Sequence, residues 1–437
     1  MTSTATATGL TPEAFDAFLA HRDEPAWLVE LRRSAWERFC RLPMPDRTQE
    51  EWMRTDVRLL RLDRFDLPVG PAAEPAASAS LLTAGVQLGG RVATQDSRPR
   101  MAELDEKWAR QGVLFGSLER LVAKHEGLLK PLLTRKVVDP GLDKFSSLSA
   151  ACWSGGTLLY IPRHLDVDEP LHCQSVMSDG GVDLGRTLVV LEAGAKATLL
   201  AESLSAAPHG GGLHCGTVEL ILGPGARLRY VNLQNWGDGV WHFAHQQAVL
   251  ERNARLQWTI GALGSRLAKV NQQVALTGAD AVAQVNGVMF TEGTQHLSYH
   301  TLQHHQAPSC RSDLLYKTAL QDRSRTVWRG MIEVDPRAQR TDGYQRNDNL
   351  LLSAQARVDS IPGLAIEADD VRCTHASTSG RVDDQQIFYC RSRGLTRNEA
   401  VRMIVTGFFQ QVFDRITIES VREALGQAIR RRIREYD

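Results

Sequence analysis

Three short phrases decide the fold: Leu191-Glu-Ala-Gly-Ala-Lys-Ala, Leu222-Gly-Pro-Gly-Ala-Arg-Leu and Leu250-Glu-Arg-Asn-Ala-Arg-Leu. Each phrase joins an apolar residue to a short turn and an alanine, and related forms follow at Leu276 and Leu352. The first four leading leucines are 31, 28 and 26 residues apart. Because such a period without intervening helices is typical of repeat architectures, the pattern predicts a β-solenoid.

The segments between these turns support strands. Short runs such as Thr187-Leu-Val-Val-Leu, Val218-Glu-Leu-Ile-Leu and Leu256-Gln-Trp-Thr-Ile are rich in β-branched and apolar residues and lack helical spacing. A β-sandwich built from the same short strands is the alternative that this pattern leaves open.

Helical patterns flank the repeats. Thr11 followed by Pro12 is typical of a helix start, and Thr396 with Glu399 forms a capping-box sequence. Helices at both ends could cover the apolar surface and free backbone groups of a solenoid's end coils. We therefore predict a mainly β chain with three parts. These are a helical N-terminal domain at 1–136 with a loose segment at 67–100 that allows one short strand, a β-solenoid at 137–390, and a helical C-terminal domain at 391–437.

The composition limits the classes of partner. The 437 residues contain 51 Lys plus Arg and 51 Asp plus Glu, so no net charge favours nucleic acid or an anionic membrane. No run reaches the roughly 18 apolar residues that a membrane-spanning helix needs. Seven scattered cysteines without a C-x-x-C pair, and a start without signal-peptide features, favour a cytoplasmic protein with reduced thiols.

Two groups of residues could bind metal. Cys373 and His375 are two apart, so on a strand both side chains would face one side and could approach iron together. A buried structural cysteine beside an incidental histidine is the alternative reading of that pair. His296, His300 and His304 are four apart, and on a strand they would be too widely spaced to hold one ion.

Motifs near the end of the repeat region resemble a known family. They are Asp-Asp-Val-Arg-Cys-Thr-His-Ala-Ser-Thr at 369–378 and Asp-Asp-Gln-Gln-Ile-Phe-Tyr-Cys-Arg-Ser-Arg-Gly at 383–394. Stretches at 341–353 and 51–55 fit in the same order, so the resemblance spans nearly the whole chain. The chain resembles the SufB/SufD family of iron–sulfur cluster assembly proteins, and the Cys-x-His form favours its SufD branch. Ala376, Ser377 and Cys390 are small departures from the usual pattern.

The resemblance implies a fold and a set of partners. It implies a right-handed parallel β-helix that pairs with SufB, and a C-terminal helical region that docks the SufC ATPase. His375, with Cys373 as a weaker candidate, would lie at the SufB–SufD interface as a ligand shared with SufB during cluster assembly. The docking candidates for SufC are Arg391, Ser392, Arg393, Gly394, Phe408, Phe409 and Val412.

The chain lacks a G-x-x-x-x-G-K-[ST] phosphate loop, so ATP hydrolysis is expected from SufC and this subunit is expected to be non-catalytic. We expect no cofactor held stably by this chain alone, a transient iron–sulfur cluster in the complex, and no assignment for flavin. A homodimer is a further option for the isolated chain. Two other functions stay open at this point: a stand-alone homodimeric iron carrier and, with little support, a β-helix enzyme acting on polysaccharide.

Overall fold

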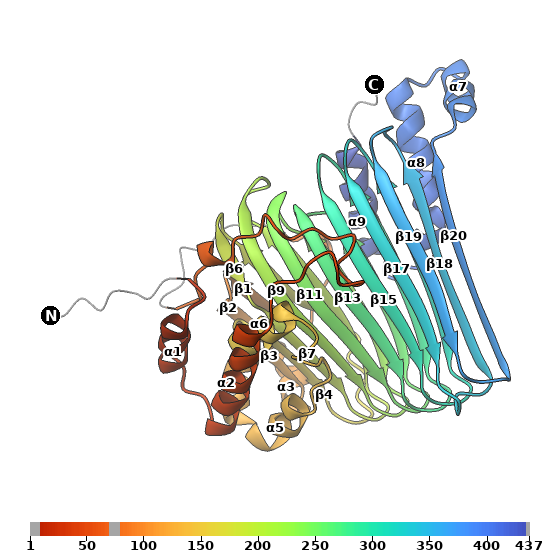
Figure 1. The fold of residues 1–437 in the computed structure, drawn as a ribbon. Helices are drawn as coiled ribbons and strands as arrows, with labels where there is room; N and C mark the ends of the chain where they lie inside the picture. The colour runs from red at the N-terminus through yellow and green to blue at the C-terminus, as the bar shows by residue number, and fades with distance from the viewer. Residues whose placement is uncertain (1–8, 70–78, 434–437) are drawn as a thin grey trace.

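The computed structural model describes residues 9–69 and 79–433 of the chain. Two long sheets, mostly of parallel strands, run side by side along one axis; the N-terminal helices lie at the first coils, and two C-terminal helices pack on the outer face of one sheet (Figure 1). None of the helices in the described residues is long and apolar enough to cross a membrane. The predicted solenoid, mainly β with helices at both ends, is confirmed.

Sheet A contains, in spatial order, β2 (Arg98–Leu104), β1 (Gly90–Gln95), β5 (Leu171–Met177), β8 (Lys196–Ser205), β10 (Arg227–Asn235), β12 (Arg255–Ala262), β14 (Val282–Thr291), β16 (Arg311–Leu320), β18 (Thr341–Leu351) and β20 (Val371–Arg381). Sheet B contains, in spatial order, β19 (Arg357–Ile366), β17 (Arg325–Val334), β15 (His296–His305), β13 (Leu267–Leu276), β11 (Gly239–Leu250), β9 (Gly211–Leu222), β7 (Arg186–Leu191), β4 (Thr157–Ile161) and β3 (Leu114–Ser117). The short β6 (Gly181–Asp183) pairs with β9.

The repeated turn phrase explains why the coils stack. Just before its buried alanine, each turn places one residue in the left-handed region, namely Gly194, Gly225, Asn253 and Asp280 in successive coils. Glycine adopts this conformation without strain, and Asn and Asp tolerate it better than other residues. The backbone N–H of each of these residues donates to a carbonyl in the next coil, as Gly194 does to Pro224 O at 2.8 Å. Equivalent turns therefore lie directly above one another.

Small and apolar side chains fill the interior. The turn alanines Ala195, Ala226, Ala254 and Ala281 are fully buried, as are larger side chains such as Trp258. Along each strand the side chains alternate between this interior and the outer face of the sheet. On strand β14, for example, Val285 and Met289 belong to the interior cluster, whereas Val288 belongs to a cluster on the outer face of sheet A.

The N-terminal region covers the first coils. Its helices are α1 (Pro12–Ala20), α2 (Ala26–Arg41), η1 (Leu62–Arg64), α3 (Glu106–Arg110), α4 (Leu118–Lys124), α5 (Glu126–Thr134) and α6 (Lys144–Cys152). The predicted cap at Thr11 is confirmed, because its hydroxyl accepts from Ala14 N. Fully buried Arg32 on α2 binds Glu24 through two contacts of 2.6 and 2.8 Å and donates to the carbonyls of Ala151 and Trp153.

The solenoid begins earlier than the predicted residue 137. Strands β1, β2 and β3 lie inside the predicted helical domain and hydrogen-bond into the two sheets. The predicted loose segment at 67–100 therefore contains a strand, and Leu81 and Leu82 donate their backbone N–H groups to buried Glu202. Residues 70–78 of that segment lie outside the described residues. The sequence allowed one short strand in this segment, where β1 lies, but did not indicate β2 or β3, because these strands follow no repeated turn.

Three helices form the C-terminal unit: α7 (Asp384–Ser392), α8 (Arg397–Phe413) and α9 (Glu419–Arg432). The predicted capping box at Thr396 and Glu399 is confirmed. Helix α8 packs on β14 and β16, while Leu425 of α9 lies over Gly261 of β12, where an added Cβ would come within 2.7 Å of it. The predicted boundary at residue 390 falls inside α7, so this helix belongs with the C-terminal unit.

Candidate functional site

The last coil of the solenoid is bare. Within the described residues, β20 pairs only with β18, and β19 pairs only with β17. Side chains that are buried in earlier coils become exposed here, as shown by Ile366, which is 40% exposed although its register partner Val334 is buried. Unpaired strand edges and exposed apolar side chains at one end mark a surface that another protein can cover.

Cys373 and His375 lie on β20 in this last coil, as predicted for a strand. Their register partners are Gly343 and Gln345, so both side chains share the inward face of the coil. Cys373 is half-buried beside Ile332 and Leu364, and burial raises the pKa of its thiol. His375 is exposed. The structure therefore places an accessible imidazole at the open end, next to a thiol that is protonated at neutral pH.

A line of hydrogen-bonded polar side chains extends from Cys373 and His375 between β19 and β20. Ser377 donates to Ser360 at 2.8 Å, and Ser360 donates to the side-chain oxygen of Asn347 at 2.7 Å. Asn347 and Gln345 are fully buried one coil further in. The inward face at the open end is therefore polar and hydrogen-bonded, in contrast to the apolar interior around Trp258.

The predicted docking residues on the C-terminal unit divide into two groups. Arg391, Ser392, Arg393 and Gly394 are exposed at the end of α7, whereas Phe408 is only partly exposed. Phe409 and Val412 are fully buried in the cluster between α8 and sheet A, so they hold the unit in place and offer no free surface. Their role as docking residues for SufC stays a prediction.

Two exposed aromatic residues were missed by the sequence reasoning. Phe388 is 74% exposed and Tyr389 is 60% exposed, both on α7, and the Arg393 guanidinium lies 5.3 Å from the Tyr389 ring. Exposed large aromatic side chains beside arginine are typical of protein-binding surfaces. The signal was present in the motif Phe-Tyr-Cys-Arg-Ser-Arg-Gly, where the arginines were chosen and the aromatic residues were not.

The three spaced histidines of β15 do not converge. His300 contacts Glu51 at 2.7 Å, His304 contacts Asp335 at 2.8 Å, and burial lowers the pKa of His296 to about 4. Across residues 9–69 and 79–433, no group of three or more His, Cys, Asp or Glu side chains is arranged to hold a metal ion. His375 therefore belongs to no such group within the described residues.

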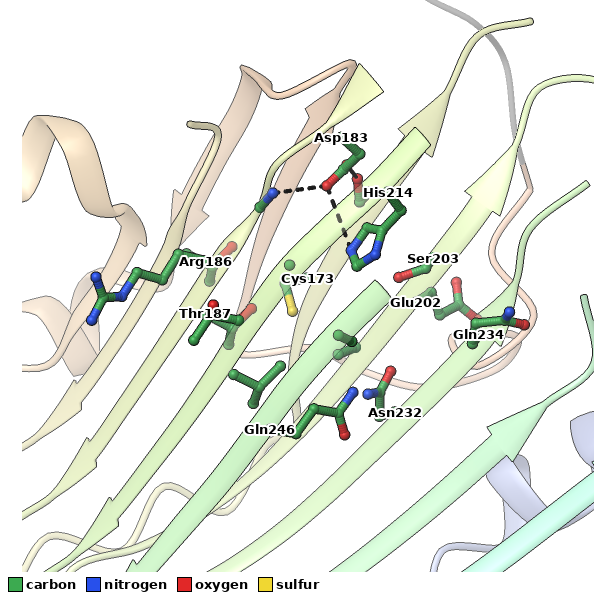
Figure 2. A pocket seen from close by; sticks show the side chains of 18 of the residues that line it. Cys173, Asp183, Arg186, Thr187, Glu202, Ser203, His214, Asn232, Gln234 and Gln246 are labelled. Carbon is green, nitrogen blue, oxygen red and sulfur yellow. Dashed lines mark hydrogen bonds and ion pairs between the residues drawn. The ribbon is translucent and has the colours of Figure 1, made fainter. Parts of the chain in front are cut away.

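A partly open cavity of about 80 Å³, lined by polar and apolar side chains, lies within the first coils (Figure 2). Asp183 accepts from Gly185 N and lies 3.8 Å from His214 Nε2, and the Nδ1 atoms of His214 and His242 are 2.7 Å apart. Burial lowers the pKa of both imidazoles and raises the pKa of the Cys173 thiol to about 12. The cavity can accommodate a few water molecules, at roughly 10–15 Å³ each, and it contains no activated thiolate.

Comparison with protein families agrees with this architecture. A model described as "SUF system FeS cluster assembly, SufBD core domain" matches residues 175–408, which is more than half of the chain. A second model, for the SufBD protein N-terminal region, matches residues 16–173. The chain therefore belongs to the SufBD family of iron–sulfur cluster assembly proteins.

Individual relatives are distant but cover the chain almost end to end. The iron–sulfur cluster assembly protein SufB of Bacillus subtilis (strain 168) is 25% identical over 427 residues, covering 94% of this chain and 90% of its own length. A SufBD family protein of Staphylococcus saprophyticus is 25% identical over 433 residues, with the same coverage. A third, from Staphylococcus epidermidis, is 24% identical over 433 residues.

Proposed function

We propose that this chain is the SufD-type, non-catalytic scaffold subunit of a cytoplasmic SUF complex, in which it pairs with a SufB-type subunit and binds the SufC ATPase. The observation that carries the proposal is the bare last coil with His375 exposed on it. The Cys373-x-His375 form supports SufD over SufB, and seven cysteines without a disulfide among them support a reducing compartment.

Pairing through the last coil follows from its free edges. A second solenoid placed against β19 and β20 would cover Ile366 and satisfy backbone groups that the monomer leaves at the edge. A related subunit is a suitable partner because it would present a similar edge, and the same geometry allows a second copy of this chain when that subunit is missing.

His375 would serve the nascent cluster at that junction. Imidazole nitrogen and thiolate sulfur both bind iron, but one chain that offers two ligands cannot complete a cluster, which usually has four. The cluster is therefore cargo shared across the junction, with His375 as the accessible ligand and Cys373 as a second candidate. No flavin is assigned to this chain.

The ATPase would dock on the C-terminal unit. Phe388 and Tyr389 form an exposed aromatic pair, and Arg391 and Arg393 add positive charge beside them. Burial of such aromatic side chains together with arginine contributes strongly to binding in many interfaces.

Affinity purification of the tagged chain from its own host tests the proposal. We expect a SufB-type subunit and a SufC-type ATPase to be recovered with it. Phe388→Ser with Tyr389→Ser should remove only the ATPase, while Leu142→Ser, which changes an exposed apolar residue far from α7, should remove neither.

His375→Ala should leave the complex intact and lower iron–sulfur enzyme maturation in cells. Recovery of the chain alone with stoichiometric iron would instead support the homodimeric carrier.

A further inference from the structure

Asn286 is a buried amide without hydrogen bonds. It lies on the outer face of β14, where its register partners are Thr259 of β12 and Leu315 of β16. The residue is 0% exposed, and neither its Nδ2 nor its Oδ1 atom has a hydrogen-bond partner. Buried amides are normally paired, because an unpaired amide loses its bonds to water and gains nothing in return.

The C-terminal unit is what covers this face. Val288, two residues along β14, and Leu315 belong to the same apolar cluster as Phe409 and Leu425 of the unit. Apolar contacts of this kind favour docking of α8 and α9 on sheet A. Asn286 opposes docking, because its amide would regain hydrogen bonds to water if the unit moved away.

Polar contacts around Asn286 also hold the C-terminal unit against sheet A. Gln257 of β12 donates to Arg415 O at 3.0 Å and accepts from the Thr417 hydroxyl at 2.9 Å. The Arg415 guanidinium lies 2.6 Å from Asp313, and Arg432 donates to the side-chain oxygen of Asn235 at 2.5 Å. Such contacts re-form with water when they open, so they guide docking without making it irreversible.

We propose that helices α7 to α9 undock reversibly from the outer face of sheet A as one body, and that Asn286 sets the balance between the docked and undocked states. The chain between β20 and α7 acts as the hinge. If the proposed docking of the ATPase on α7 is correct, a force applied there moves a unit that is poised to leave the sheet. The use of this motion rests on the proposed function, whereas the motion itself belongs to the isolated chain.

Hydrogen–deuterium exchange of the purified full-length chain, without partners, tests the inference. In Asn286→Leu, amides of α8 and α9 should exchange about tenfold more slowly, because the opposing amide is gone. In Gln257→Leu, which removes two contacts to the unit, the same amides should exchange about fivefold faster. Amides of β9 and β11 are the internal control and should not change in either variant.

Reversible undocking of the C-terminal unit requires a defined change of exchange in each variant. It is overturned if a folded Asn286→Leu variant leaves exchange in α8 and α9 unchanged or makes it faster. It is also overturned if Gln257→Leu leaves that exchange unchanged, a result that remains decisive if the Asn286 variant fails to fold. Independent exchange of α8 and α9, in place of a joint response, would rule out movement as one body. Because no partner is present, none of these results depends on whether the chain binds SufC.

Discussion

The two ends of the solenoid are finished in opposite ways. At the first end, β2 and β3 run antiparallel to β1 and β4 and close the sheets, and helices pack around them. At the last end, β19 and β20 leave free edges, and inward side chains such as Ile366 are exposed. A solenoid needs each end coil covered. This chain therefore supplies the cover of its first end itself, and under the proposed function a partner would supply the cover of the last end.

The largest effect on stability should come from breaking the covered end at Arg32. Arg32→Ala would leave the largely buried Glu24 with only its 3.2 Å contact to Arg22 and would remove two hydrogen bonds to the carbonyls of Ala151 and Trp153. Removing one member of a buried ion pair costs about 3–5 kcal/mol. Denaturant unfolding of the variant should show a loss of that size.

Arg33 provides the matched control for Arg32. Its ion pair with Asp16 lies at the surface, where the two side chains are 55% and 64% exposed. Arg33→Ala should therefore change the free energy of unfolding by about 0.5 kcal/mol or less. Equal losses at positions 32 and 33 would contradict the view that a buried arginine ties the N-terminal helices to the first coils.

A smaller effect of opposite sign is expected at Lys269, where residues 50–52 lie across sheet B. Lys269 Nζ is buried, donates to Glu51 O at 3.0 Å and lies 2.8 Å from His300 Nε2. Burial is the main cause that lowers the pKa of Lys269 to about 7, and the positive charge of Arg329 acts in the same direction. The negative charges of Glu51 and Asp143 act to raise the pKa but do not offset burial. Lys269→Met should raise the free energy of unfolding at pH 7 by about 1–3 kcal/mol, because a costly buried charge is removed.

The pH dependence separates this cause from ordinary repacking. Between about pH 7 and the usual lysine pKa of 10.5, the unfolded chain holds a proton on Lys269 that the folded chain has lost. The stability of the wild-type protein therefore gains a contribution that rises with pH across this window, by up to about 1.4 kcal/mol per pH unit from this group. The Met variant should lack that contribution, so its advantage in the free energy of unfolding should shrink steadily as the pH rises from 7 toward 10.5. A constant difference at every pH would contradict the assigned pKa.

The repeated part of the fold could be predicted from sequence because each coil uses the same local chemistry. Gly194, Gly225 and Asn253 each supply a left-handed turn residue, and a buried alanine follows each of them. The ends carry no such repetition. Strand β1 pairs with the distant β5 and β3 pairs with the distant β4, which no local pattern reveals, while β2 pairs with its sequence neighbour β1.

The candidate site was predictable only in part for the same reason. Alternation along a strand placed Cys373 and His375 on one face, and β20 has that geometry. Helical spacing indicated an apolar face on α8 but could not say that this face packs on sheet A of the same chain, so Phe409 was predicted as a docking residue although it is fully buried. The cavity around His214 and His242 needs two coils in register, and the adjacent His214-Cys215 pair gave no sign of it.

The smallest effect on the folded monomer, and the sharpest test of the bare end, is expected for Ile366→Lys. The side chain is 40% exposed and inward-facing in the last coil, so the substitution should change the free energy of unfolding by only about 0.5 kcal/mol. If a partner solenoid covers this coil, the same lysine would be buried without a counter-charge, and the partner's Kd should rise at least tenfold, which corresponds to about 1.4 kcal/mol. Leu59→Lys, at a 72% exposed position in the N-terminal region, should leave both unfolding and pairing unchanged. Unaltered pairing of the Ile366 variant would move the partner's surface away from the apolar side of the last coil around Val334, because a charge buried there without a partner lowers affinity.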